Sequence, residues 1–213
     1  MSGHSDSHRH SNHHNKNLYH VKRVVHRPSP DPRGTKPNVL ICGTYTFLPG
    51  ARQAALRALA NEGYTPDLFE TYHSRQEPEW IHEDGVVVEA KALSGEVFMV
   101  LIETEPNSLG LVSDNDGMVT GTLYYVIRTV IDYYNDRSGN KWETFVEGTF
   151  RDGVAAEKAA RSCLLDANVS RESFTEYDVN NEKEGRLWDD DVVVHAVAAN
   201  GTNYLVSIQE KSL

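Results

Sequence analysis

The chain has little cysteine, no long apolar run and no excess of positive charge, and each absence excludes a class of protein. Its 213 residues include only two cysteines, so a disulfide framework is excluded and we expect free thiols in a reducing compartment. The sequence contains no run of about 18 apolar residues, the length that a membrane-spanning helix needs, and the first residues lack the apolar segment of a secretion signal. The net charge of −10 argues against nucleic acid, because that binding depends on Lys and Arg neutralising phosphates. We therefore expect a cytoplasmic protein with neither a membrane nor a nucleic-acid partner.

The first 17 residues are dominated by His, Ser and Asn and contain almost nothing apolar. Such a segment buries too little apolar surface to offset the loss of chain entropy, so we expect residues 1–17 to be a disordered tail. Its histidines would bind transition metals only weakly, because a metal site needs ligands held in a fixed geometry.

The rest of the chain is a tandem repeat. When Leu18 is aligned with Leu123, LYHVKRVVH matches LYYVIRTVI, and the similarity continues through a shared Gly-Thr pair and the small residues of a helical pattern. After one inserted residue it resumes, with the VVV run at 86–88 matching that at 192–194. Self-similarity over such a length indicates duplication of one supersecondary unit. The predicted organisation is a tail at 1–17, a first repeat at 18–104, a linker at 105–122 and a second repeat at 123–213.

Each repeat shows the same order of predicted elements, because alternating apolar residues indicate strands and a stripe of small residues indicates a helix. The expected elements are strands at 18–26, 38–42 and 68–74, a helix at 50–62 and a hairpin at 85–104, with their counterparts at 123–131, 142–147, 173–179, 153–166 and 191–210. This order predicts an α+β fold of two ββαβββ repeats with mainly antiparallel sheet. One helix covers only one face of a sheet, so we expect the repeats to pack as an intramolecular pseudo-dimer with a ligand cleft between them.

The loop GTYTFLPG at 43–50 joins a strand to a helix, which is where many proteins bind phosphate. It has neither the Lys-Ser/Thr pair of a phosphate loop nor a G-x-G-x-x-G run, and its counterpart in the second repeat keeps only Gly, Thr and an aromatic residue. We therefore interpret it as a structural junction, with the aromatic residue packing between sheet and helix.

Two arginines, Arg23 and Arg128, occupy the same mid-strand position on a face otherwise made of Tyr and Val. A guanidinium on a sheet face needs a carboxylate or another anion. One hypothesis is a ligand site between the repeats, with the candidate residues Arg23, Arg128, Tyr19 and Tyr124. The alternative is an ion pair with a nearby acid such as Glu70, Glu103 or Glu147.

Candidate catalytic residues are sought where the repeats differ, because duplicated folds often keep a site in one copy only. Cys42 aligns with Glu147, and Glu89 aligns with His195. These four are the residue types used for nucleophilic and acid/base catalysis. The acidic stretch at 113–117 lacks the glutamate of a calcium loop, so we predict neither a metal site nor a cofactor.

The motifs GTYTFLPGARQAALRALANEGY, TVIDYYNDRSG and DDDVVVHAVAANGTNYLVS together resemble a group of proteins from filamentous ascomycete fungi of about this length. The resemblance covers nearly all of 18–210. It implies a fungal, cytosolic protein, but it carries no activity, cofactor or catalytic residue.

Two functions remain open from the sequence. The first is a non-enzymatic module, monomeric or homodimeric, that binds a small ligand or a protein partner between the repeats. The second is a small acid/base enzyme of hydrolase or isomerase type in the same cleft.

Overall fold

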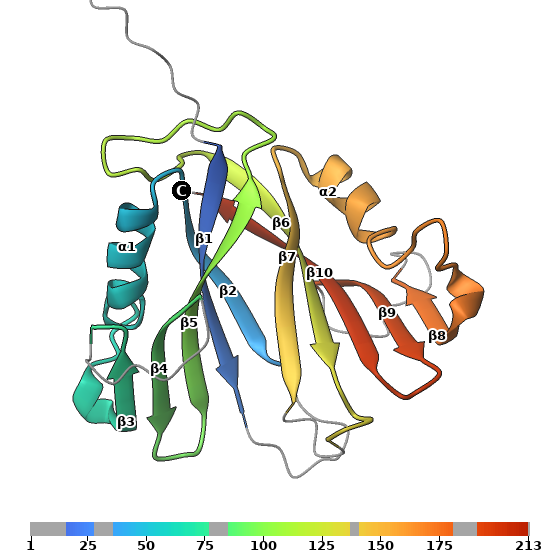
Figure 1. Cartoon of the computed structure of the whole chain (residues 1–213), viewed down its shortest axis with the longest axis horizontal. Helices are drawn as coiled ribbons and strands as arrows, with labels where there is room; N and C mark the ends of the chain where they lie inside the picture. Colours follow the sequence, from blue (N-terminus) through green and yellow to red (C-terminus); the bar gives the residue numbers. More distant parts are fainter. Residues whose placement is uncertain (1–15, 28–35, 77–84, 137–140, 181–190, 213) are drawn as a thin grey trace, which may run out of the picture.

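The computed structural model describes residues 16–27, 36–76, 85–136, 141–180 and 191–212, so nearly all of the expected tail lies outside the described residues. The chain forms two five-stranded antiparallel sheets, each with one helix (Figure 1). The first repeat contains β1 (Asn17–His26), β2 (Asn38–Tyr45), α1 (Leu48–Asn61), β3 (Phe69–Ser74), β4 (Val86–Ala92) and β5 (Val97–Pro106). The second contains β6 (Thr122–Ile131), β7 (Trp142–Phe150), α2 (Gly153–Ala160), β8 (Phe174–Val179), β9 (Val192–Ala198) and β10 (Asn203–Ser212). The α+β fold of two similar ββαβββ halves is confirmed.

The two sheets have equivalent strand orders, β2-β1-β5-β4-β3 and β7-β6-β10-β9-β8. Their irregularities recur as well: the shift in register between Val21 and Lys22 of β1 has its counterpart between Val126 and Ile127 of β6. The shifts in the β3–β4 and β4–β5 pairings likewise recur in the β8–β9 and β9–β10 pairings. β-Bulges are specific features of a fold, so their repetition shows the duplication in the backbone itself.

Several element boundaries differ from those expected, most clearly those of β2, β7 and α2. β2 and β7 run three residues beyond the predicted ends, to Tyr45 and Phe150, because Gly43 and Gly148 stay within the strands. A Cβ atom on Gly43 would lie 3.0 Å from the Tyr45 ring, so the absence of a side chain lets the ring pack over the strand. Helix α2 ends at Ala160 instead of 166, and the following residues form turns.

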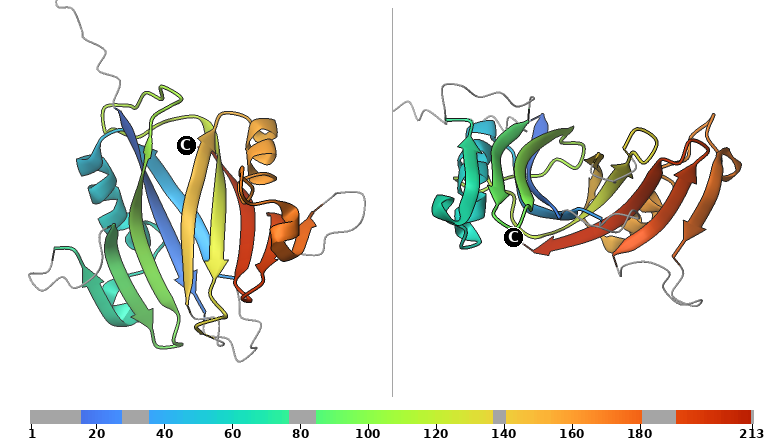
Figure 2. Two further views of the ribbon diagram at one scale, coloured as in Figure 1. Left: turned by 45° about the vertical axis from the view of Figure 1, so that its right-hand side comes forward. Right: turned by 90° about the horizontal axis from the view of Figure 1, so that it is seen from below.

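The helices cover the outer faces of the sheets, and the sheets meet through the faces that the helices leave bare. Figure 2 shows the helices at the two flanks and the sheets between them. Below α1 and α2 lie two separate apolar cores, and a third is shared by both halves. The shared core contains Leu18 and Ile41 of the first half and Leu123, Tyr125 and Ile127 of the second. Among the described residues, no helix is both long and apolar enough to cross a lipid bilayer.

A buried polar layer lies where the sheets meet. His20 of β1 and Tyr125 of β6 occupy equivalent positions in the repeats, and both side chains are fully buried. The Thr44 hydroxyl connects them, at 2.9 Å from His20 Nδ1 and 2.7 Å from the Tyr125 hydroxyl oxygen. Burial raises the pKa of Tyr125 to about 12, so this hydroxyl stays protonated at neutral pH. Buried polar groups must be paired, so this layer fixes how the halves align.

The outer edges of β2 and β7 are also joined to the opposite half, by two equivalent hydrogen bonds. The Ile41 amide donates to Gln209 Oε1 at 2.6 Å, and the Val146 amide donates to Glu103 Oε1 at 2.8 Å. Each side chain therefore satisfies a backbone donor that an edge strand would otherwise leave open. The pseudo-twofold relation between the halves thus extends to individual side chains.

Candidate functional site

A groove of about 670 Å³ lies at the junction of the two halves, beside the edge of β2. This volume falls within the range of roughly 300–1,000 Å³ that is typical of small-molecule sites. From the first half the groove is lined by Val25, Arg27, Lys36, Pro37, Asn38 and Val39, and from the second by Ile127, Asp191, Ser207, Ile208, Gln209 and Glu210.

The groove combines apolar side chains with a charged rim. Val39 and Ile127 belong to the shared apolar core and reach the groove from opposite halves. At the rim, Lys36 Nζ donates to both carboxylate oxygens of Asp191, at 2.8 and 2.7 Å. The Lys36 side chain is 18% exposed and that of Asp191 is 51% exposed. The ion pair therefore bridges the two halves at the solvent boundary.

The pseudo-equivalent junction, between β5 and β7, is occupied by larger side chains. Lys22 stands where the second repeat has Ile127, and its Nζ donates to Glu103 at 2.7 Å and to the Thr144 carbonyl at 2.6 Å. Trp142 stands where the first repeat has Pro37, and its ring stacks on His26 with 5.6 Å between centroids. The two junctions have thus diverged. The groove lies at the junction with the smaller side chains, and at the junction with the larger ones the two halves are joined by hydrogen bonds and ring stacking.

The two repeated arginines do not line this groove. Both lie on the helix-covered face of their sheet, and each is paired within its own half. Arg23 forms an ion pair with Glu62 at 2.9 Å. Arg128 pairs with Glu147 at 2.5 Å and lies 4.6 Å from the centroid of the Phe145 ring. The expected partner Glu147 is thus confirmed for Arg128, whereas Arg23 pairs with Glu62, which was not among the expected acids.

Arg23 lines a different cavity, of about 210 Å³, inside the first half. An aromatic cluster of Tyr64, Phe69 and Phe98 forms part of its wall. Tyr19 and Tyr124, the other candidate ligand-binding residues, pack against the cores under α1 and α2. The four residues proposed from the sequence are therefore divided between the two helix-side faces and do not form one site between the repeats.

The four candidate catalytic residues are also separated. Cys42 and Glu147 occupy equivalent positions on the helix-covered faces of opposite sheets, and Glu147 is engaged by Arg128. Glu89 lies in β4 opposite His73, and His195 lies in β9 opposite Asp178. The structure thus distributes them over both halves.

The electrostatics of the cysteines argue against a reactive thiolate. Burial, together with the nearby Glu62 carboxylate, raises the pKa of the Cys42 thiol. Burial and the Glu147 carboxylate raise the pKa of the second cysteine, Cys163, to about 11. Both side chains are thiols at neutral pH, whereas a nucleophilic cysteine needs a lowered pKa.

Sequence reasoning missed the residues that define the groove. Lys36 recurs as Lys141, which pairs instead with Asp132 of its own half at 3.2 Å. Asp191, the partner of Lys36, has only Gly85 at the equivalent position. The signal that could have found the groove is therefore a repeated lysine together with an acid, Asp191, whose position in the first repeat is a glycine.

Neither a protein-family model, a curated protein nor a solved structure matches the chain. The function is therefore inferred from the geometry of the junction.

Proposed function

We propose that the protein is a non-enzymatic binding module whose groove between the repeats holds a small molecule with an apolar body and an anionic group. The observation that carries the proposal is the difference between the two junctions: one is open beside Val39 and Ile127, and its counterpart is occupied by Lys22 and Trp142. If the protein retains a ligand site at one of its two equivalent junctions, that junction should be open and the other should be occupied by side chains.

The charged rim supports an anionic ligand. Lys36 supplies positive charge beside the groove, where Arg27 is paired with Glu96 at 2.7 Å and the acids Asp191 and Glu210 also belong to the lining. Half of the Asp191 side chain is exposed, and such a surface ion pair contributes only about 0–1 kcal/mol to stability. A ligand carboxylate can therefore replace Asp191 on Lys36 at small cost, while the apolar body of the ligand covers Val39 and Ile127.

A second occupant, an extended peptide, is favoured by the position of β2 at the edge of its sheet. Edge strands present free backbone groups to which a peptide strand can pair. The Ile41 amide already donates to Gln209, so the edge is partly closed and the small molecule is the better candidate.

The alternative function, an acid/base enzyme, has less support. Its candidate residues Cys42, Glu147, Glu89 and His195 lie in separate parts of the two halves, and burial raises the pKa of the Cys42 thiol. That the protein is fungal, cytoplasmic, and monomeric or homodimeric stays a prediction from the sequence.

The test is a thermal-shift screen of medium-chain fatty acids and aromatic carboxylates, followed by titration calorimetry of those that stabilise the protein. Lys36→Ala is expected to weaken their binding by about tenfold, since a hydrogen bond to a charged group contributes about 1.5–3 kcal/mol. Lys141→Ala, at the equivalent position of the other repeat, is the matched control and should leave binding unchanged. Equal effects of the two substitutions would contradict the proposal.

A further inference from the structure

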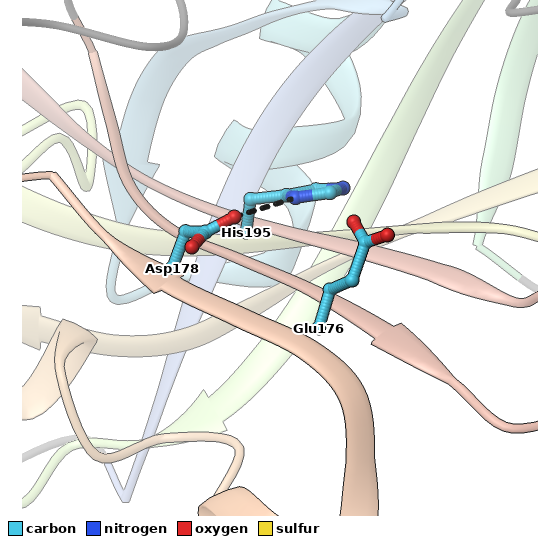
Figure 3. A group of neighbouring side chains, drawn as sticks. All are labelled: Glu176, Asp178 and His195. Atoms are coloured by element: carbon cyan, nitrogen blue, oxygen red, sulfur yellow. Dashed lines mark ion pairs between the residues drawn. The ribbon is translucent and has the colours of Figure 1, made fainter.

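Three potential metal ligands converge on the second sheet, away from the groove. Glu176 and Asp178 of β8 and His195 of β9 each offer one ligand atom, and these atoms lie within 4.8 Å of one another. Figure 3 shows the two carboxylates and the imidazole on one side of the strand pair. The intervening residue, Tyr177, packs toward the core under α2, so alternation along β8 turns Glu176 and Asp178 to the opposite face.

The hydrogen bonds behind His195 determine which of its nitrogens can bind a metal. Asn203 Nδ2 donates to the Gly201 carbonyl at 3.0 Å, which leaves Asn203 Oδ1 as an acceptor. His195 Nε2 lies 3.0 Å from this oxygen and must donate to it. In the neutral ring the lone pair is then on Nδ1, which is the nitrogen that lies toward Asp178. Metal-bound histidines are typically oriented by such a second hydrogen bond.

The distances suit a small divalent ion after a modest adjustment. His195 Nδ1 and Asp178 Oδ2 are 3.9 Å apart, and two ligands on a tetrahedral zinc ion with bonds of about 2.1 Å are about 3.4 Å apart. The His195 side chain is only 5% exposed and is fixed, whereas that of Asp178 is 47% exposed and can move toward the ion. Glu176 is exposed as well.

The first repeat provides an internal comparison. Its cross-strand pair is reversed, with His73 on β3 and Glu89 on β4. The position of Glu176 is taken by Thr71. A histidine and one carboxylate are thus common to both repeats, and the third metal-binding side chain belongs to the second repeat.

We propose that Glu176, Asp178 and His195 form a binding site for one divalent transition-metal ion, of which Zn²⁺ is the best match to one imidazole nitrogen and two carboxylate oxygens. Three protein ligands leave at least one coordination position for water. The site is independent of the groove and of the ligand proposed for it.

The experiment is calorimetric titration of the full chain with ZnCl₂, in a background in which the five histidines of the N-terminal segment, His4, His8, His10, His13 and His14, are replaced by Ser. This background removes other histidines that bind zinc. The expected result is one saturable equivalent. His195→Asn and Glu176→Gln should each weaken binding at least tenfold, and His73→Asn, the matched control in the first repeat, should change it less than twofold.

Binding of Co²⁺ can be followed by its visible absorption, which would not change if the three side chains had only a structural role. This absorption should appear at one equivalent and be lost with His195→Asn. It should also be lost with Glu176→Gln, which we expect to keep the fold because the side chain is exposed. Asn203→Ala should weaken binding about 10–100-fold, the usual cost of losing the partner of a metal-bound histidine. Zinc binding that is absent, or that is unchanged in both His195→Asn and Glu176→Gln, would overturn the proposal.

Discussion

Two pairs of residues at the junction show how the repeats have diverged together. In one half a buried lysine, Lys22, lies beside Glu103, and in the other half Ile127 and Gln209 occupy the same positions. Burial lowers the pKa of Lys22, and the Glu103 carboxylate opposes this shift. The charged acceptor Glu103 thus occurs with the charged Lys22. In the other half, the neutral acceptor Gln209 occurs with the apolar Ile127.

Because the pairs have diverged together, Glu103→Gln alone should be strongly destabilising. The glutamine can still accept the Val146 amide, as Gln209 does for Ile41, but it leaves the Lys22 ammonium buried without its countercharge. Removing one partner of a buried pair costs about 3–5 kcal/mol, and we expect about 3 kcal/mol less free energy of unfolding, measured by urea denaturation.

The double substitution Lys22→Ile with Glu103→Gln copies the second repeat and serves as the rescue. Replacing both members of a buried ion pair by neutral ones is often neutral or stabilising, so the double variant should return to within about 1 kcal/mol of the parent. If it is no more stable than Glu103→Gln, the proposed compensation between the two positions is wrong.

At the scale of elements, the repeat made most of the fold predictable. Within the described residues, the ten strands and the two α-helices were expected in the right order, since each pattern occurs twice. The exact ends were not, because Gly43 continues the strand under the Tyr45 ring and only packing reveals this. The role of Gly50 was hidden for the same reason: a Cβ atom there would lie 2.6 Å from the Asp116 carbonyl oxygen of the linker.

The linker contact explains why the loop GTYTFLPG differs from its counterpart. The segment folds back on the end of β2, where the Thr46 amide donates to the Gly117 carbonyl and the Val119 amide to the Thr44 carbonyl, at 2.9 and 2.8 Å. At the equivalent position the second repeat has Ala155, whose amide donates to the helix-capping Asp152 at 2.8 Å. The glycine is therefore explained by the approach of a backbone, without any ligand.

The substitution Gly50→Ala tests whether the close approach of the linker backbone, and not helix propensity alone, determines the effect of a side chain at this position. In an ordinary helix the change would stabilise the protein by about 1 kcal/mol. Here the close contact with the Asp116 carbonyl should make it destabilising, by about 1–3 kcal/mol as in other overpacked sites. Ala155→Gly in the second helix is the control and should cost only the propensity of about 1 kcal/mol. A more stable Gly50→Ala protein in chemical denaturation would show that the linker does not pack this closely.

For the whole molecule, the sequence predicted that the halves pair but not which side chains meet. Alternation places Tyr19 and Arg23 on one face of β1, yet it does not say whether that face is turned to the helix or to the other repeat. The structure turns it to the helix, which moves both repeated arginines away from the junction. What remains there is a buried polar layer around His20 and Tyr125, with the groove beside it along the edge of β2.

The most direct test of the binding-module account is to fill the groove with the side chains of the other junction. Ile127→Lys with Gln209→Glu places in the groove the pair that Lys22 and Glu103 form in the first repeat, and equal unfolding midpoints would establish that the fold is kept. Amide NMR spectra of both proteins are then recorded with the carboxylate that stabilises the parent most. The account predicts shifts around Val39 and Ser207 in the parent and their loss in the filled variant. Equal binding by the two proteins, or shifts elsewhere in the parent, would contradict it.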